Sequence, residues 1–85
     1  MDEPPKVTVR FWAAARAAAG VDSAAVDGGT LAEVLAAAVA AHGDLAALLP
    51  RCSYLLDGVA VRASPASTRI AAGSVVEVLP PFAGG

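Results

Sequence analysis

The last residues of the chain are the ones whose types and order could do chemistry. The sequence closes on Pro80, Pro81, Phe82, Ala83, Gly84 and Gly85, directly after the apolar run Val75–Leu79. Neither proline has an N–H to give a neighbouring strand and each fixes φ, so we expect the chain to leave a sheet here in extended form. At about 3.3 Å per residue these positions reach roughly 20 Å. Because glycine lacks Cβ, the Gly-Gly end fits a narrow channel and leaves the Gly85 carboxylate open to activation.

Two strands are expected to support this tail. Val75–Leu79 is β-branched and apolar with one charge, which is typical of a largely buried strand. Lys6–Trp12 alternates, with Val7, Val9 and Phe11 on one side. This alternation predicts a half-buried strand whose other side carries Lys6, Thr8, Arg10 and Trp12.

Helical signals follow the first strand. Residues 13–19 are alanine-rich and end at Gly20, which predicts one or two turns. Residues 21–27 form a weak second strand that Gly28 and Gly29 break. Thr30 and Glu33 then have the spacing of a capping box at the start of the main helix, which Gly43 ends. Its apolar residues recur on one face, predicted to pack across the sheet: Leu31, Val34, Leu35, Ala38 and Val39.

A hairpin is expected in the second half of the chain. Residues 44–49 resemble a short helical connection that Pro50 stops. Asp57-Gly58 lies between the apolar runs 53–56 and 59–62, which is a strong hairpin signal. Residues 63–72 are predicted to be mostly loop, with Gly73 turning into the last strand. The expected order is therefore strand, strand, helix, hairpin, loop, strand.

Length and composition limit the classes of function. Eighty-five residues make one domain, too small for a deep active site of its own, so function is expected to need a partner. The net charge of −2, with six scattered basic residues, predicts no nucleic-acid binding. No membrane span or secretion signal is expected, which favours the cytoplasm, and residues 1–5 are expected to be disordered. The single Cys52 predicts neither an internal disulfide nor a thiolate metal site, and the chain itself is expected to bind no cofactor or metal.

Four segments together resemble a known family. Phe11–Arg16, the Asp57-Gly58 turn, Gly73 and the end of the chain from Val75 to Gly85 are similar to the small, sulfur-carrying subunit of molybdopterin synthase. The resemblance covers residues 6–85. It implies an α+β ubiquitin-like β-grasp fold: a mixed sheet of about five strands, one main helix across it, the first and last strands parallel at its centre, and a flexible Gly-Gly tail over residues 80–85. The whole chain, 1–85, would be a single sulfur-carrier domain.

The resemblance also implies a reaction and its partners. An adenylyltransferase related to ubiquitin-activating enzymes would use ATP and magnesium to adenylate Gly85, and a sulfur donor protein would convert it to a thiocarboxylate. The tail would then enter the large subunit of molybdopterin synthase, in a heterotetramer, and deliver sulfur to cyclic pyranopterin monophosphate. Pro80, Pro81 and Phe82 would direct the tail, and Gly84 would give access. The chain would be non-catalytic alone.

Candidate interface residues surround the root of the tail. If Val76 and Val78 face the helix, Leu79 lies on the open side of the sheet near Trp12. The resemblance implies that Trp12, Ala60 and Leu79 belong to the partner-facing surface. Trp12 could instead close the end of the core, and Ala60 is small. Arg16 is either a solvated surface charge or a contact to an acidic partner.

Other functions share these features. A carrier for thiamine or cysteine biosynthesis would differ mainly in its large partner. A ubiquitin-like protein modifier would form isopeptide bonds to lysines, and higher-mass conjugates would identify it. A β-grasp interaction module with an inert tail would keep its activity after removal of Gly84 and Gly85.

Overall fold

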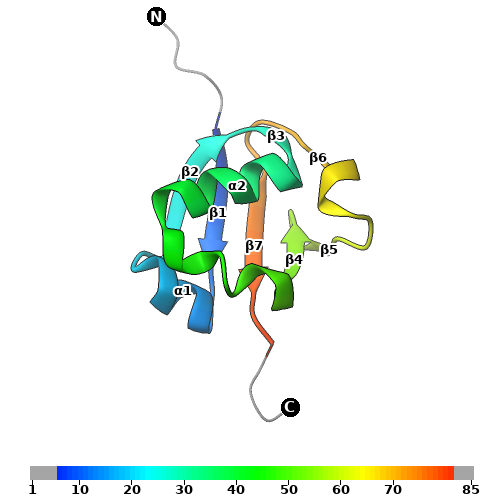
Figure 1. Ribbon diagram of the computed structural model, residues 1–85. Helices are drawn as coiled ribbons and strands as arrows, with labels where there is room; N and C mark the ends of the chain where they lie inside the picture. The colour runs from blue at the N-terminus through cyan, green and yellow to red at the C-terminus, as the bar shows by residue number, and fades with distance from the viewer. Residues whose placement is uncertain (1–5, 82–85) are drawn as a thin grey trace, which may run out of the picture.

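The computed structural model describes residues 6–81, which form a mixed five-stranded sheet with one long helix across it (Figure 1). The strands of this sheet, in the spatial order β2-β1-β7-β4-β5, are β1 (Lys6–Phe11), β2 (Ser23–Asp27), β4 (Ser53–Leu56), β5 (Val59–Ala60) and β7 (Val75–Leu79). A separate two-stranded ladder joins β3 (Gly29–Thr30) to β6 (Arg69–Ile70). The helices are α1 (Ala13–Ala19) and α2 (Leu31–Ala41), with 3₁₀ turns η1 (Gly43–Leu45), η2 (Leu49–Arg51) and η3 (Pro65–Ser67).

The first and last strands lie side by side at the centre of the sheet. β1 and β7 are parallel, with Val9 opposite Val76 and Phe11 opposite Val78. Two parallel neighbouring strands need a long crossover connection, and here residues 12–74 connect the end of β1 to the start of β7. Both strands therefore run toward the end of the sheet at which α1 lies, and β7 carries the chain out of the domain there (Figure 1). This confirms the predicted central pair.

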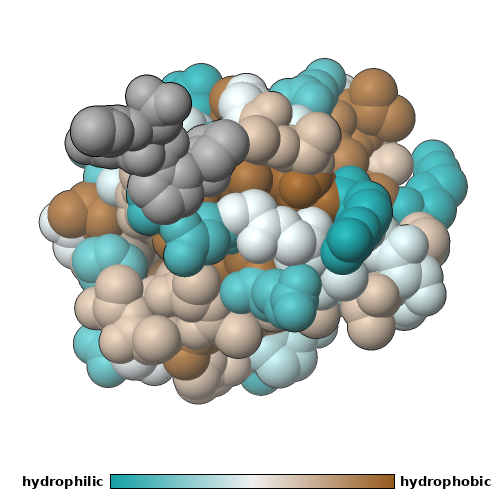
Figure 2. Space-filling view, turned by 90° about the horizontal axis from the view of Figure 1, so that it is seen from above, coloured by the Kyte–Doolittle hydropathy of each residue, from teal (hydrophilic) through white to brown (hydrophobic). Residues whose placement is uncertain are grey.

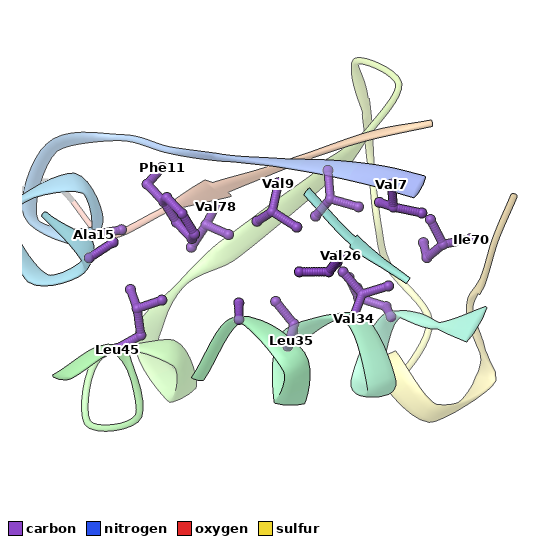
Figure 3. Packing of buried hydrophobic residues seen from close by; sticks show 14 residues of the cluster. Val7, Val9, Phe11, Ala15, Val26, Val34, Leu35, Leu45, Ile70 and Val78 are labelled. Atoms are coloured by element: carbon purple, nitrogen blue, oxygen red, sulfur yellow. The ribbon is translucent and has the colours of Figure 1, made fainter. Parts of the chain in front are cut away.

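The core lies between the sheet and α2. Val7, Val9 and Phe11 alternate along β1 and are at most 3% exposed. They point from the sheet toward Leu35 and other residues of α2, while Ala15 and Leu45 close the end of the core beside Phe11 (Figure 3). Of the predicted helix face, Val39 is half-buried and the other residues are buried: Leu31, Val34, Leu35 and Ala38. The period-2 and period-3.6 patterns therefore found the part of the core that lies between β1 and α2, but not Ala15, Leu45 and Ile70.

The start of α2 confirms the predicted capping box. The Glu33 N–H donates to Thr30 Oγ1 at 3.2 Å, and the Thr30 N–H donates to Glu33 Oε1 at 2.8 Å. Gly29 has φ +145°, and a Cβ there would overlap the Glu33 carboxylate. Glycine is thus required immediately before this cap. The helix ends at Ala41, with His42 as its cap.

The predicted hairpin is also present. β4 and β5 pair through Leu55 opposite Ala60, and Asp57 and Gly58 both have positive φ, as a type I′ turn requires. The Asp57 N–H donates to Val75 O, and Asp57 Oδ1 accepts from the Val75 N–H, both at 2.9 Å. The turn is therefore attached directly to the start of β7.

The second strand ends at Asp27, before Gly28 and Gly29, as predicted, but three other local details differ from the expectation. Gly29–Thr30 pairs with Arg69–Ile70 in a ladder that was not predicted, inside the segment expected to be mostly loop. That ladder is too short to leave a periodic pattern in the sequence. Pro50 does not stop the connection, because it lies in the first turn of η2, where a missing N–H removes no helical hydrogen bond. The second strand begins at Ser23, two residues later than expected.

On the face seen from above (Figure 2), polar side chains of the described residues are not gathered in one place. Viewed from above, hydrophilic residues are scattered among hydrophobic and intermediate ones (Figure 2). Among residues 6–81, no helix has both the length and the apolar character needed to cross a membrane.

Candidate partner-binding face and root of the tail

The root of the tail is fixed to the sheet up to Pro80. Leu79 ends β7, Pro80 is buried and Pro81 is exposed, so the chain emerges from the domain between the two prolines. The Trp12 N–H donates to Val78 O at 3.2 Å, which joins the end of β1 to the end of β7. The roles predicted for Phe82, Ala83, Gly84 and Gly85 fall outside the described residues and stay predictions.

One face of the sheet is not covered by α2. Along β7, Val76 and Val78 are fully buried against the core, whereas the alternate residues Val75, Glu77 and Leu79 are half-buried. The strand register identifies their neighbours on the same side. We call this surface the open face and define it by Thr8, Arg10, Trp12, Ser53, Leu55, Ala60, Val75, Glu77 and Leu79.

Trp12 is the largest exposed apolar residue of the open face. It is 42% exposed and lies in extended conformation directly before α1, of which it is the N-cap. Its indole Nε1–H donates to Glu77 Oε1 at 3.0 Å. The guanidinium carbon of Arg10 lies 5.1 Å from the centroid of the ring, a cation–π distance. Of the two interpretations left open by the sequence, these contacts favour a surface anchor over a residue that closes the core.

Leu79 and Ala60 lie on the open face at different distances from Trp12. Leu79 follows the Phe11–Val78 pair, so it is the neighbour of Trp12 in the register, and Ser53 lies opposite it on β4. Ala60 is exposed on the edge strand β5 and pairs with Leu55, which in turn pairs with Glu77. Two strands therefore separate Ala60 from β1, and Leu55 supplies the apolar area between them.

Arg16 lies at the border of the open face and is paired with an acidic residue. Its Nε lies 2.7 Å from Asp22 Oδ1, and the two side chains are 65% and 76% exposed. Together with Trp12 and Arg10 these two residues line a shallow depression of about 130 Å³ beside the root of the tail. An exposed pair of this kind contributes little to stability, so the predicted solvated charge describes Arg16 and a partner contact stays a prediction.

Cys52 is a half-buried thiol packed against the core. Its Sγ–H donates to Leu48 O at 3.4 Å, and burial raises the pKa of the thiol. The neighbouring Tyr54 donates its hydroxyl to Leu49 O at 2.8 Å, and burial, followed by the charge of Cys52, raises the Tyr54 pKa to about 12. A thiol with a raised pKa is mostly protonated near neutral pH and is a poor nucleophile.

Residues 6–81 hold no group of three or more His, Cys, Asp and Glu side chains close enough to bind a metal ion together. What the described residues do offer is a binding surface, the open face, and a root for the tail. The chemistry they could support is the presentation of a reactive end to another protein.

Sequence reasoning placed Arg10 on the side of the first strand that carries Trp12, but it missed Leu55 and the contacts that Arg10 and Glu77 make with the indole. Arg10 and Glu77 are register partners on β1 and β7, so the parallel pairing already predicted would have placed them beside each other. Leu55 precedes the Asp57-Gly58 turn by two residues, and the register of that hairpin puts it on the same side as Ala60.

The strand order, the single helix across the sheet and the exit of β7 beside α1 define a ubiquitin-like β-grasp protein. The ThiS family matches residues 9–85, nearly the whole chain, and the chain belongs to this family. The predicted membership of a ubiquitin-like sulfur-carrier family is therefore confirmed. No curated protein matches the chain by sequence.

Solved structures share the fold over most of the chain. SAMP1 from Haloferax volcanii superposes with a TM-score of 0.81 at 25% identity, covering 94% of this chain and 99% of that one. A putative molybdopterin converting factor, subunit 1, from Pyrococcus furiosus gives 0.78 at 22% identity, covering 92% and 99%. A chain of the protein–protein complex of subunits 1 and 2 of molybdopterin-converting factor from Helicobacter pylori superposes with a TM-score of 0.70 at 24% identity. The match covers 94% of this chain and 99% of that one. The last two likenesses concern the fold alone.

Proposed function

We propose that this chain is a sulfur carrier in molybdenum cofactor biosynthesis whose reactive group is the carboxylate of Gly85. The observation that carries the proposal is the root of the tail: Pro80 is buried directly after Leu79, the register neighbour of the exposed Trp12, and the chain leaves the domain at the exposed Pro81. A partner that binds the open face would therefore lie next to the point at which the tail leaves the domain. Membership of the ThiS family supports the same conclusion.

Loading would proceed in two steps on an activating enzyme of the adenylyltransferase type. The Gly85 carboxylate attacks the α-phosphorus of ATP, with magnesium as counter-ion, and pyrophosphate leaves. Sulfur at the oxidation level of hydrosulfide, supplied by a donor protein, then attacks the acyl carbon and AMP leaves. The product is a Gly85 thiocarboxylate. The chain contributes a Cβ-free end that the activating enzyme can enclose.

Delivery would take place in a large subunit. The thiocarboxylate sulfur attacks a carbon of cyclic pyranopterin monophosphate and displaces an oxygen substituent of that carbon. Water then cleaves the acyl–sulfur bond, so that the sulfur stays on the pterin and Gly85 returns to a carboxylate. The open face holds the carrier against the large subunit while the tail occupies its active site. The complex of subunits 1 and 2 in Helicobacter pylori supports a partner of this kind. A heterotetramer of two carriers and two large subunits, acting in the cytoplasm, is part of the proposal.

Intact mass spectrometry tests the loading step. The chain is incubated with a cognate activating enzyme, ATP, magnesium and a sulfur donor, and a variant lacking Gly84 and Gly85 serves as control. The expected result is a gain equal to the replacement of one oxygen by sulfur in the full chain and no gain in the deletion variant. No gain with an activating enzyme that forms the acyl-adenylate would overturn the proposal.

Protein modification is a second candidate function. It is favoured by the likeness to SAMP1, a small archaeal modifier protein, at 25% identity. A modifier would join Gly85 to lysine side chains, so higher-mass conjugates carrying the chain would appear in extracts and would disappear with the Gly-Gly deletion. A carrier for thiamine or cysteine biosynthesis would load sulfur in the same way and fail only with the pyranopterin acceptor.

A further inference from the structure

We propose that Arg10 and Glu77 are positioning residues that hold the Trp12 indole in its binding orientation before the partner arrives. The inference rests on the proposed function for the identity of the partner, the large subunit. It assigns a role to two charged residues in the middle of a surface whose other side chains are small or apolar.

Backbone hydrogen bonds fix the main chain of Trp12 independently of its side chain. Its N–H donates to Val78 O at 3.2 Å, and its carbonyl accepts from the Ala15 N–H at 2.9 Å and from the Arg16 N–H at 3.4 Å. These hydrogen bonds tie the residue to β7 on one side and to the first turn of α1 on the other. What remains free is rotation of the side chain.

Arg10 and Glu77 restrict that rotation from two directions. Glu77 Oε1 accepts the indole Nε1–H at 3.0 Å, and the Arg10 guanidinium lies over the ring at 5.1 Å from its centroid. The two charged residues are themselves register neighbours on the central strands β1 and β7. No Arg10–Glu77 ion pair is formed among the described contacts, so each charged group is directed at the indole.

The contacts of Arg10 and Glu77 determine which kind of pocket on the partner can receive Trp12. The polar atom of the indole is already satisfied, and one face of the ring is occupied, so the exposed remainder of Trp12 is carbon. An apolar pocket without a hydrogen-bond acceptor can therefore receive it at no desolvation cost to Nε1. Because the side chain is ordered in advance, binding loses less conformational entropy than it would with a freely rotating anchor.

The free chain provides the first test, because Trp12 is its single tryptophan and gives one indole N–H signal in a ¹⁵N NMR spectrum. Glu77→Gln keeps an acceptor oxygen and should leave the signal and its rate of hydrogen exchange nearly unchanged. Glu77→Ala should shift the signal and accelerate its exchange with water. A signal that does not respond to Glu77→Ala would overturn the positioning role without any partner present.

Binding to the large subunit provides the second test. Glu77→Ala should weaken the affinity by about tenfold, Arg10→Ala by about threefold, and Glu77→Gln by less than about twofold. In a Trp12→Phe background the effect of Glu77→Ala should vanish, because the donor it served is gone. An equal loss in both backgrounds would show that Glu77 contacts the partner itself and would overturn the proposal. If the wild-type chain does not bind the large subunit, the proposed function fails, whereas the NMR result still decides the role of Glu77.

Discussion

Phe11 and Trp12 are consecutive aromatic residues on opposite faces of the same sheet, and their exposures are 3% and 42%. Phe11 packs under the cover of α2 and lies edge-on to His42, with ring centroids 6.2 Å apart. Trp12 has Arg10 and Glu77 in contact with its ring and Leu79 as its register neighbour. The side covered by α2 is buried and apolar, whereas the open face combines apolar area with two charged groups directed at the indole. The first arrangement stabilises the fold, and the second is suited to a surface that must be exposed in one state and covered in another.

The largest expected effect separates these two aromatic residues. Phe11→Ala should lower the free energy of unfolding by about 3–5 kcal/mol, because it leaves a cavity in the core. Trp12→Ala should lower it by less than about 1 kcal/mol, because the site is already open to water. Urea denaturation followed by circular dichroism measures both. Similar losses in the two variants would mean that the open face also supports the fold.

The cap of α2 tests the covered side without touching the core. Thr30→Ala removes the oxygen that accepts the Glu33 N–H and should cost about 1 kcal/mol of stability. Thr30→Ser keeps that oxygen and serves as the matched control, with an expected change below about 0.5 kcal/mol. Affinity for the partner should stay the same in both variants. A change in affinity at equal stability would extend the binding surface to the helix side.

Tyr54, which packs on the side of the sheet covered by α2, makes the free energy of unfolding depend on pH in the alkaline range. Burial, followed by the charge of Cys52, raises its pKa in the folded protein to about 12, so the folded state holds the phenol proton more tightly than the unfolded state does. Between about pH 10 and 12 the unfolded state therefore binds fewer protons, and the free energy of unfolding falls as the pH rises.

Tyr54→Phe should cost about 1 kcal/mol at neutral pH by removing the hydrogen bond to Leu49 O, and should reduce the pH dependence between about 10 and 12. Cys52→Ala is the companion variant, since burial raises the pKa of that thiol as well. An unchanged alkaline slope in the Tyr54→Phe variant would assign the dependence to other groups.

The smallest effect is expected at Arg16. Because its pair with Asp22 is largely exposed, Arg16→Ala should change the free energy of unfolding by less than about 0.5 kcal/mol, with little dependence on salt. Thermal unfolding at low and high ionic strength measures this. A loss above about 1 kcal/mol would show that the depression beside the root of the tail is part of the stable core rather than of the binding surface.

Much of the fold was accessible from the sequence because its signals are local. The alternation of Val7, Val9 and Phe11, the Thr30–Glu33 cap and the Asp57-Gly58 turn each depend on residues close together in the chain, and all three are present. The β3–β6 ladder depends on residues about forty positions apart and only two long on each side, so no local pattern reveals it.

The open face was predicted only in part for a related reason. Alternation placed Trp12 and Leu79 on it, but the contact between Trp12 Nε1 and Glu77 spans 65 positions and depends on the β1–β7 register. The sequence around Glu77 does not indicate that this glutamate accepts a hydrogen bond from Trp12. The family resemblance predicted that the two strands are parallel, but only the register in the structure shows that Glu77 lies close to the indole.

The position of the sulfur tests the central claim most directly. After loading, cleavage at arginine separates residues 52–62, which contain Cys52, from residues 70–85, which contain Gly85. The account predicts that the fragment 70–85 alone gains the mass of an oxygen-to-sulfur replacement, because the Cys52 thiol is half-buried, hydrogen-bonded and protonated. Sulfur added to the fragment 52–62, with 70–85 unchanged, would contradict the account and make Cys52 the carrier.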